Sequence, residues 1–305
     1  MMVKGACGCS CQGLYSATPP GKFVPGLEFS GTILEMGRAV AEVDGWKPAV
    51  GDKVMGVTRF GGYATHVLCE ATYVRALPPG WGFQEGASFL CTALTAWYGL
   101  VKLGALSENQ TVLVHSAAGG VGLASLEIVA AHGAQAIATI GSPAKAQMLR
   151  DRMDLEPHAI LVRPSSSQEF RQQLDVCLEA MEPPRVGIDI VMDSIQGPYF
   201  QPAYDKLARG GRMVVFGAAS MTPAGDRPNW LKLAWHWLRR PMVRPYRGGD
   251  MCAPLLSSLL TAHMTGMSLL AYPWWPICAR IRECMSELDV GFWLGRVHAW
   301  ARACV

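Results

Sequence analysis

The chain has 305 residues, of which 50% are hydrophobic and 17% are charged, with a formal net charge of +3. This composition excludes a disordered chain, which needs low hydrophobicity and a high net charge. The 33 glycines and 20 prolines punctuate the whole length and exclude a coiled coil. No block of basic residues provides the electrostatic footprint of a nucleic-acid-binding protein. At roughly 150 residues per domain, the length predicts two domains.

Short strands and tight turns are predicted for the N-terminal part of the chain. The turn-forming pairs there are Pro25-Gly26, Gly61-Gly62 and Pro79-Gly80. The predicted strands lie at residues 29–36, 53–58 and 63–68. From residue 84 to residue 103 apolar residues recur at helical spacing, with an expected break near Thr92. This part of the chain therefore forms a small β-rich unit followed by a helix.

Strands and helices alternate regularly from residue 111 onward. The predicted strands are residues 111–115, 135–140, 159–162, 186–192 and 212–216. The predicted helices are residues 121–132, 143–152, 166–181 and 201–208. Ser142 is the expected N-cap of the second helix, with Pro143 in its first turn. Short, continuously apolar strands between helices indicate a parallel sheet covered on both faces, which is a doubly wound α/β domain.

The pattern is looser in the C-terminal third. Residues 229–240 form a predicted helix with aromatic residues on one side and basic residues at its end. Packing on the sheet edge is favoured over a membrane-surface role, because basic residues suit a helix C-terminus. The charge-free stretch 252–278 is interrupted by prolines and disfavours a membrane span. Further helices and strands are expected at residues 253–264, 267–271, 280–289 and 290–300.

Cysteine spacing and the N-terminal segment bear on metal binding and on location. Cys7, Cys9 and Cys11 form a C-x-C-x-C run. Structural zinc usually takes two C-x(2–4)-C pairs, and no second pair follows, so a reduced loop is favoured and no metal is predicted. Residues 1–16 lack the apolar core of a signal peptide. Reduced cysteines and the missing signal predict a cytoplasmic protein.

A glycine-rich turn between a predicted strand and a predicted helix is the strongest functional signal. It matches the dinucleotide-binding fingerprint with the first glycine replaced by Ala117. Gly119 lets the backbone approach a pyrophosphate, Gly122 lets the helix pack closely, and the helix N-terminus attracts phosphate. The alternative is a glycine-rich turn used only for packing. The predicted pyrophosphate-binding residues are Ala117, Ala118, Gly119, Gly120, Val121 and Gly122.

The end of the following strand distinguishes NADPH from NADH. An NAD site normally has Asp or Glu there, about 20 residues beyond the glycine turn, to bind the ribose 2′-hydroxyl. Residues 139–145 read T-I-G-S-P-A-K and contain no carboxylate. Ser142 and Lys145 would bind a 2′-phosphate by hydrogen bonding and charge, so NADPH is the predicted cofactor. Alternatively, Lys145 is a solvated lysine on a helix face.

With these motifs the chain resembles the medium-chain dehydrogenase/reductase superfamily, in its zinc-free NADPH:quinone oxidoreductase branch. It is most similar to vesicle amine transport protein-like members. The motifs occur in order between residues 4 and 300. They are residues 12–15 (QGLY), 25–31 (PGLEFSG), 51–54 (GDKV), 62–64 (GYA), 94–96 (LTA), 114–122 (VHSAAGGVG), 187–193 (GIDIVMD) and 211–217 (GRMVVFG).

The resemblance implies a Rossmann domain plus a GroES-like β-rich catalytic domain, with the active site in the cleft between them. The implied boundaries are 1–90 for the GroES-like part, 91–275 for the Rossmann domain and 276–305 for a segment that returns to the catalytic domain. Relatives usually have further strands before the position of Val3 and a final helix and strand beyond Val305. The chain is therefore expected to be truncated at both ends, with an incomplete catalytic domain.

The resemblance also implies hydride transfer from NADPH to a quinone or an α,β-unsaturated carbonyl compound. It places Phe216, Gly217 and Ala218 beside the nicotinamide, with Thr95 near it. Tyr15 matches a tyrosine that in some relatives donates a proton or orients the substrate; the alternative is a packing aromatic.

Leu27 stands where zinc-dependent relatives carry histidine, so zinc chemistry is not expected. The implied partners are a small-molecule substrate and a second copy in a homodimer. The competing hypothesis is a catalytically weak NADPH-binding protein that acts at vesicle membranes or with protein partners.

Overall fold

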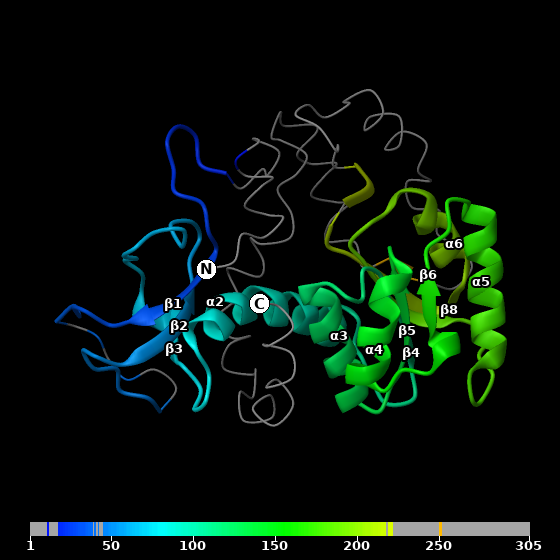
Figure 1. The fold of residues 1–305 in the computed structure, drawn as a ribbon, viewed down its shortest axis with the longest axis horizontal. Helices are drawn as coiled ribbons and strands as arrows, with labels where there is room; N and C mark the ends of the chain where they lie inside the picture. Colours follow the sequence, from blue (N-terminus) through cyan, green and yellow to red (C-terminus); the bar gives the residue numbers. More distant parts are fainter. Residues whose placement is uncertain are drawn as a thin grey trace. The chain divides into compact units, whose positions relative to one another are not determined.

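The computed structural model describes residues 11, 18–38, 40, 42, 45–217, 219–221 and 250–251. The chain divides into two compact units, with the boundary between Thr95 and Ala96, and each is described separately (Figure 1). The predicted elements between residues 229 and 300 lie outside the described residues. So do the motif at 12–15 and the cysteines Cys7 and Cys9.

The first unit contains an antiparallel three-stranded sheet in the order β1-β2-β3. Its strands are β1 (Glu28–Thr32), β2 (Lys53–Val57) and β3 (Val74–Ala76). A 3-10 turn, η1 (Ala71–Tyr73), directly precedes β3. The predicted strand at 53–58 is confirmed, and the one at 29–36 is shorter than expected because pairing with β2 stops at Thr32.

The predicted strand at 63–68 is wrong. The chain bends there, and the backbone at the start of the segment bonds to the loop before β1 instead of to a strand. Gly62 N–H donates to the carbonyl of Gly26 over 3.0 Å, and Tyr63 N–H donates to that of Pro25 over 2.8 Å. The third strand of the sheet is therefore β3, which the sequence pattern did not reveal.

Helix α2 (Phe83–Trp97) continues into a π-helical turn, η2 (Tyr98–Leu103). The expected break near Thr92 is wrong, because the Thr92 hydroxyl donates to carbonyls of the preceding turn and leaves the helix intact. The irregularity comes after Trp97, where Gly104 N–H bonds to the carbonyl of Gly99, five residues earlier, over 2.8 Å.

The second unit is built on a parallel sheet in the order β6-β5-β4-β7-β8-β9. The strands are β4 (Thr111–Val114), β5 (Gln135–Ile140), β6 (Ile160–Val162), β7 (Ile188–Asp193), β8 (Leu207–Val215) and β9 (Asp250–Met251). The chain runs outward from β4 to β6 and then returns to β7 on the other side of β4. The strand order therefore reverses between β4 and β7, which is where open α/β sheets bind ligands.

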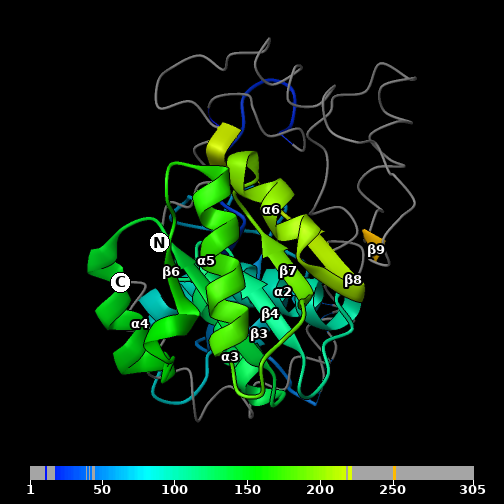
Figure 2. The ribbon, with the colours of Figure 1, turned by 90° about the vertical axis from the view of Figure 1, so that its right-hand side faces the viewer.

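Helices cover both faces of this sheet, which confirms the predicted doubly wound fold (Figure 1). Helices α3 (Gly120–Ala131) and α4 (Ala146–Met153) lie on one face. Helices α5 (Ser167–Ala180) and α6 (Phe200–Asp205) lie on the other, side by side in front of the sheet in Figure 2. Short 3-10 turns occur at η3 (Pro143–Lys145), η4 (Pro157–Ala159), η5 (Gly197–Tyr199) and η6 (Ala219–Met221).

Two serines precede helical segments of this unit, and only Ser142 was predicted to be an N-cap. The Ser166 hydroxyl oxygen accepts hydrogen bonds from the backbone amides of Gln168 and Glu169, and so caps α5. Ser142 precedes the 3-10 turn η3 instead of α4, and its side chain makes no capping hydrogen bond. Ser142 therefore occupies the predicted N-cap position, with Pro143 in the first turn, but that turn is 3-10 and the Ser142 hydroxyl makes no capping hydrogen bond.

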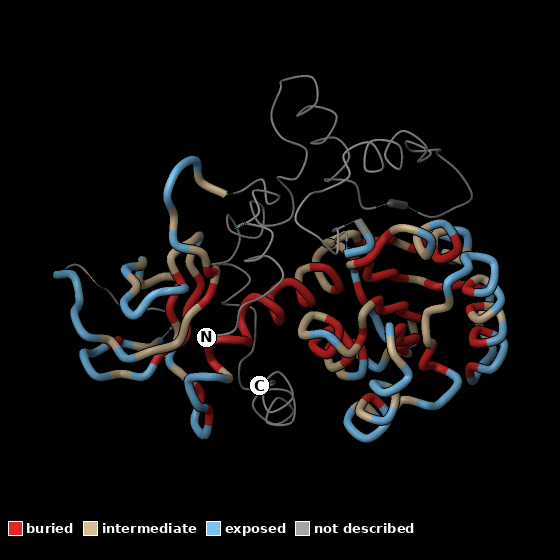
Figure 3. Tube along the Cα trace, turned by 45° about the horizontal axis from the view of Figure 1, so that its top comes forward, coloured by how far each residue is buried: buried red, intermediate tan, exposed pale blue. Residues whose placement is uncertain are grey.

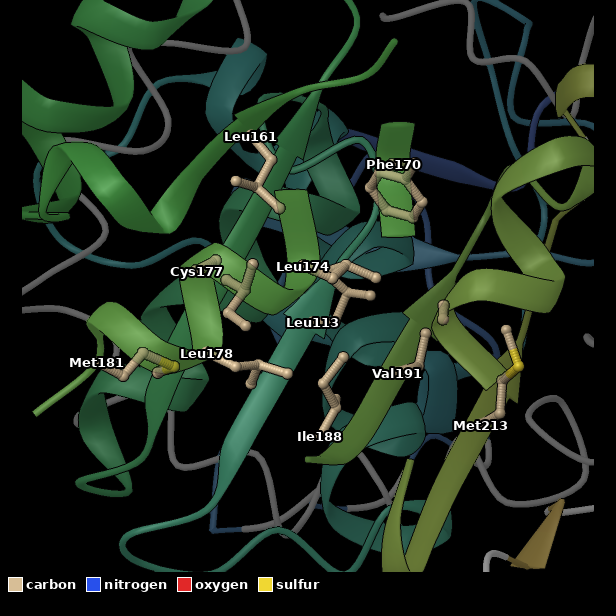
Figure 4. Close-up of a cluster of buried hydrophobic side chains, with 12 residues drawn as sticks. Leu113, Leu161, Phe170, Leu174, Cys177, Leu178, Met181, Ile188, Val191 and Met213 are labelled. Atoms are coloured by element: carbon tan, nitrogen blue, oxygen red, sulfur yellow. The ribbon is translucent and has the colours of Figure 1, made fainter. Parts of the chain in front are cut away.

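The core of the second unit lies between α5, α6 and the sheet. Leu174 of α5 packs against Leu113 of β4 in Figure 4, and Phe170, Ile188 and Met213 belong to the same buried cluster. Figure 3 shows that the centre of this unit is buried, whereas exposed residues lie on its outside. No helix among the described residues is long and apolar enough to cross a membrane.

Candidate functional site

The loop after β4 forms the predicted glycine-rich turn. Ser116 has a φ of +53°, so the left-handed residue comes one position before Ala117. Ala117 does not need a positive φ, which explains why alanine is tolerated in place of the first glycine. Its amide donates to the carbonyl of Thr139 on β5 over 2.9 Å, and Gly119 N–H closes the turn on the Ser116 carbonyl over 2.8 Å.

Gly122 is required where α3 packs on this turn. A Cβ at Gly122 would lie 2.4 Å from the Ser116 carbonyl oxygen and 2.6 Å from the Cα of Ala117. Those neighbours are backbone atoms that cannot move aside. The close packing that the sequence motif predicts for this glycine is therefore present.

The N-terminus of α3 opens toward solvent. Gly119 caps the helix with an extended backbone and is exposed, and Ala118, Gly120 and Val121 are half-buried. Backbone bonding begins with Leu123 N–H to the Gly119 carbonyl over 2.8 Å. The first N–H groups of the helix have no acceptor within it, and with the helix dipole they form an anion-binding site.

Ser142 and Lys145 follow β5 at the same edge of the sheet. The amide of Lys145 donates to the Ser142 carbonyl over 3.1 Å, so the two residues sit in one tight turn. Ser142 is half-buried and Lys145 is exposed. No carboxylate occurs between Thr139 and Lys145. The turn therefore presents the Ser142 hydroxyl and the Lys145 ammonium group next to the end of β5.

Arg163, directly after β6, is a site residue that the sequence reasoning missed. Its amide donates to the Ile140 carbonyl over 2.9 Å. A Cβ at Gly141 would lie 2.7 Å from the Arg163 Nη2 atom, so the guanidinium lies against Gly141, beside Ser142. A basic residue just past the strand that neighbours β5 was the signal that could have found it.

Arg163 also faces the ring of Tyr199. The guanidinium carbon lies 5.7 Å from the ring centroid, and the Tyr199 hydroxyl donates to the Pro164 carbonyl over 2.8 Å. Burial lowers the pKa of Arg163, while the nearby Tyr199 and Asp193 raise it. Arginine nonetheless remains charged in proteins, so a positive charge stands at this end of the sheet edge.

His115 lies beneath the glycine-rich turn and is buried. Its Nδ1 atom is 3.0 Å from the Thr139 hydroxyl oxygen, and its Nε2 atom has no hydrogen-bond partner. Burial lowers the pKa of His115; Asp193 raises it and Arg163 lowers it further. The imidazole is therefore held neutral in the folded protein.

The loops after β7 and β8 are tied together. The Asp193 carboxylate accepts hydrogen bonds from the amides of Ile195 and Gln196, each over 2.8 Å. The Gln196 side-chain amide donates to the Gly217 carbonyl over 2.7 Å. Phe216 N–H donates to the Asp193 carbonyl over 2.9 Å. Phe216 and Gly217 are thus fixed at the carboxyl edge of the sheet.

The remaining predicted site residues are not brought to this edge by the described structure. Tyr15 and Ala218 lie outside the described residues. Thr95 belongs to the first unit, is buried, and donates its hydroxyl to the Cys91 carbonyl over 2.6 Å. Among the residues that the structure describes, no group of three or more His, Cys, Asp or Glu side chains could hold a metal ion.

Sequence comparison finds relatives over most of the chain, although no family model matches it. It is 36% identical over 192 residues to a mycocerosic acid synthase-like polyketide synthase of Mycobacterium tuberculosis, covering 63% of this chain and 8% of that protein. It is 30% identical over 229 residues to the synaptic vesicle membrane protein VAT-1 homolog of Danio rerio, covering 75% and 44%. The chain thus spans less than half the length of these relatives.

Solved structures share the fold at lower identity. Mycobacterial Rv1454c, solved as a complex with NADPH, has a TM-score of 0.69 and 23% identity, covering 98% of this chain and 78% of that one. A quinone oxidoreductase of Pseudomonas syringae has a TM-score of 0.63 and 22% identity, covering 96% and 78%. The CurK enoyl reductase has a TM-score of 0.61 and 24% identity, covering 92% and 83%. The structural neighbours are oxidoreductases of the medium-chain dehydrogenase/reductase superfamily, the superfamily that the motifs of this chain resemble, and the chain shares their fold.

Proposed function

We propose that the chain is an NADPH-dependent oxidoreductase that transfers hydride to a quinone or an α,β-unsaturated carbonyl compound without zinc. The observation that carries the proposal is the turn at residues 116–122, where an open helix N-terminus stands at the strand-order reversal between β4 and β7. That combination of backbone amides, helix dipole and position in the sheet suits a dinucleotide pyrophosphate.

The edge beside this turn favours NADPH over NADH. Ser142, Lys145 and Arg163 offer a hydroxyl and two cations, and the absence of a carboxylate between residues 139 and 145 avoids repulsion of a 2′-phosphate. Arginine binds phosphate through two parallel N–H groups, and lysine adds a point charge. The complex of mycobacterial Rv1454c with NADPH supports the same assignment.

The proposed reaction also assigns roles to residues at the other end of the cofactor site. When bound, NADPH supplies the hydride. Phe216 and Gly217, fixed by the loop after β7, would then orient the nicotinamide. The family resemblance assigns Thr95 and Ala218 to the nicotinamide as well. Reduction of a quinone or enone leaves an oxyanion that needs a proton, and we assign its donation to Tyr15.

A second candidate function rests on one observation, the 30% identity to the synaptic vesicle membrane protein VAT-1 homolog. In that case the chain is a catalytically weak NADPH-binding protein that acts at vesicle membranes or with protein partners. Co-sedimentation with anionic liposomes tests it. Recovery of the chain with the vesicles supports this function, and recovery only in the supernatant contradicts it.

The hydride-transfer proposal is tested by following the oxidation of NADPH with a panel of quinones and enones. Activity with at least one acceptor class, retained after dialysis against a chelator, is the expected result. Gly31→Ala serves as a folding control, because no atom lies within 4 Å of the added Cβ. NADPH binding without oxidation by any acceptor would contradict the catalytic part of the proposal. A homodimer in the cytoplasm remains part of the proposal and is tested by sedimentation and cell fractionation.

A further inference from the structure

Tyr199 reaches across the sheet to the end of β6. Tyr199 is the last residue of η5, the turn that follows β7. Its side chain nevertheless contacts Arg163 and Pro164, which follow β6. In the sheet order, β4 and β5 stand between those two strands. A side chain from one half of the sheet edge therefore supports a charged group on the other half.

The Tyr199 ring is held on several sides. Its hydroxyl donates to the Pro164 carbonyl over 2.8 Å. The ring meets Phe170 edge-on, with centroids 5.3 Å apart and an interplanar angle of 83°, and lies 6.4 Å from the His115 ring. Phe170 is itself fully buried in the core of the second unit. These contacts hold the Tyr199 side chain in one rotamer.

The guanidinium of Arg163 lies near both this ring and Gly141. Its central carbon is 5.7 Å from the Tyr199 centroid, a distance suited to a cation–π interaction. Its Nη2 atom lies so near Gly141 that a Cβ there would approach it to 2.7 Å. The Nη1 atom is buried and has no hydrogen-bond partner. The long arginine side chain is therefore confined next to Ser142 by an aromatic ring and a glycine.

We propose that Tyr199 is a positioning residue that sets the preference for NADPH over NADH by holding the Arg163 guanidinium where a 2′-phosphate binds. The inference rests on the proposed function. Bidentate recognition of a phosphate requires the planar guanidinium in one orientation, and a free arginine loses side-chain entropy when it adopts that orientation. Tyr199 fixes the orientation before the cofactor arrives, and it does so without touching the cofactor.

The test measures dissociation constants for NADPH and for NADH in Tyr199→Leu and Tyr199→Phe. In Tyr199→Leu the dissociation constant for NADPH rises by about tenfold, because the cation–π contact and the preorganisation of Arg163 are lost. The dissociation constant for NADH stays within about twofold of the wild-type value. Tyr199→Phe keeps the ring, so its dissociation constant for NADPH stays within about threefold of the wild-type value. Tyr204→Leu, which removes a ring stacked on Phe200 of the same helix, α6, leaves the NADPH to NADH ratio unchanged.

A double-mutant cycle shows whether Tyr199 acts through Arg163. In an Arg163→Met background, Tyr199→Leu produces no further loss of NADPH affinity, because the group it positions is gone. Adenosine 2′,5′-bisphosphate, titrated by calorimetry, reports the same pattern without the nicotinamide. Equal weakening of NADPH and NADH by Tyr199→Leu, or the same loss in both backgrounds, would overturn the inference. The proposed function fails separately, if the wild-type chain binds neither dinucleotide or prefers NADH.

Discussion

The side-chain amide of Gln196 donates a hydrogen bond to the carbonyl oxygen of Gly217 over 2.7 Å, joining the loop after β7 to the second residue after β8. Gln196 has a φ of +61°, a conformation that a residue with a side chain rarely adopts. The Asp193 carboxylate stabilises this conformation by accepting a hydrogen bond from the backbone amide of Gln196. Such over-determined strain is typical of positions that fix a ligand-binding edge.

Gln196→Leu is predicted to loosen Gly217 and with it the nicotinamide end of the site. The kcat/KM for NADPH oxidation falls about tenfold, equivalent to the loss of one buried hydrogen bond. Binding of adenosine 2′,5′-bisphosphate stays unchanged, because that fragment does not reach the nicotinamide end. Steady-state kinetics and calorimetry check the two parts. If Gln196→Leu weakened the binding of adenosine 2′,5′-bisphosphate as much as it weakened the reaction with NADPH, the substitution would have caused a general loss of structure instead.

Gly122→Ala is predicted to abolish NADPH binding and to lower the free energy of unfolding by about 2 kcal/mol, the usual cost of overpacking. The added Cβ would meet backbone atoms of Ser116 and Ala117. Urea unfolding and NADPH titration provide the measurements, with Gly31→Ala as the matched change in open space. A variant as stable as the control, with unchanged affinity, would mean that the turn and α3 are not packed as described.

Ser142→Asp is predicted to weaken NADPH binding by more than about tenfold while leaving NADH binding equal or stronger. A carboxylate at this turn repels a 2′-phosphate and accepts a hydrogen bond from a 2′-hydroxyl. Ser107→Asp is the control, because Ser107 is an exposed residue in the loop that precedes β4, away from the carboxyl edge. If both dinucleotides responded alike to Ser142→Asp, the 2′-phosphate would bind elsewhere.

The stability of the protein is predicted to fall as the pH drops through the titration range of His115. Its pKa in the folded protein is below the ordinary value near 6.5, so the unfolded state binds more protons below that pH. The stabilising contribution is present above pH 6.5 and is lost as the pH falls below it, at up to about 1.4 kcal/mol per pH unit. Urea unfolding at pH 7.5 and 5.5 measures the slope.

His115→Gln should flatten this part of the pH profile relative to the wild type. His66→Gln, at an exposed position, should leave the wild-type slope unchanged. A profile that is as steep in His115→Gln as in the wild type would assign the pH dependence to another group.

The sequence predicted the parallel sheet well because its strands are short, apolar and buried on both faces. Strand β5 occupies the predicted residues 135–140. Strand β8 begins at Leu207, earlier than predicted, because an irregular register with β7 between Ile188 and Ile190 accommodates the glycine-rich segment. The failed strand at 63–68 had the right local pattern, but the amide of its first residue, Tyr63, bonds to the carbonyl of Pro25 in the loop before β1. Such long-range pairing leaves no local signal in the sequence.

The candidate site was predictable only where it is local in sequence. The turn at residues 117–122 and the neighbouring Ser142 and Lys145 follow from strand–turn–helix order. Arg163 and Tyr199 are 36 positions apart, and their contact depends on the strand order of the folded sheet. Residue patterns alone do not contain that relationship.

The most direct test of cofactor binding is a titration of the purified chain with NADPH and, separately, with NADH, following nicotinamide fluorescence. The arrangement of Ser142, Lys145 and Arg163 around the sheet edge predicts saturable NADPH binding that is at least about tenfold tighter than NADH binding. Equal affinity for the two dinucleotides, or no binding of either, would contradict the assignment of this edge as an NADPH site.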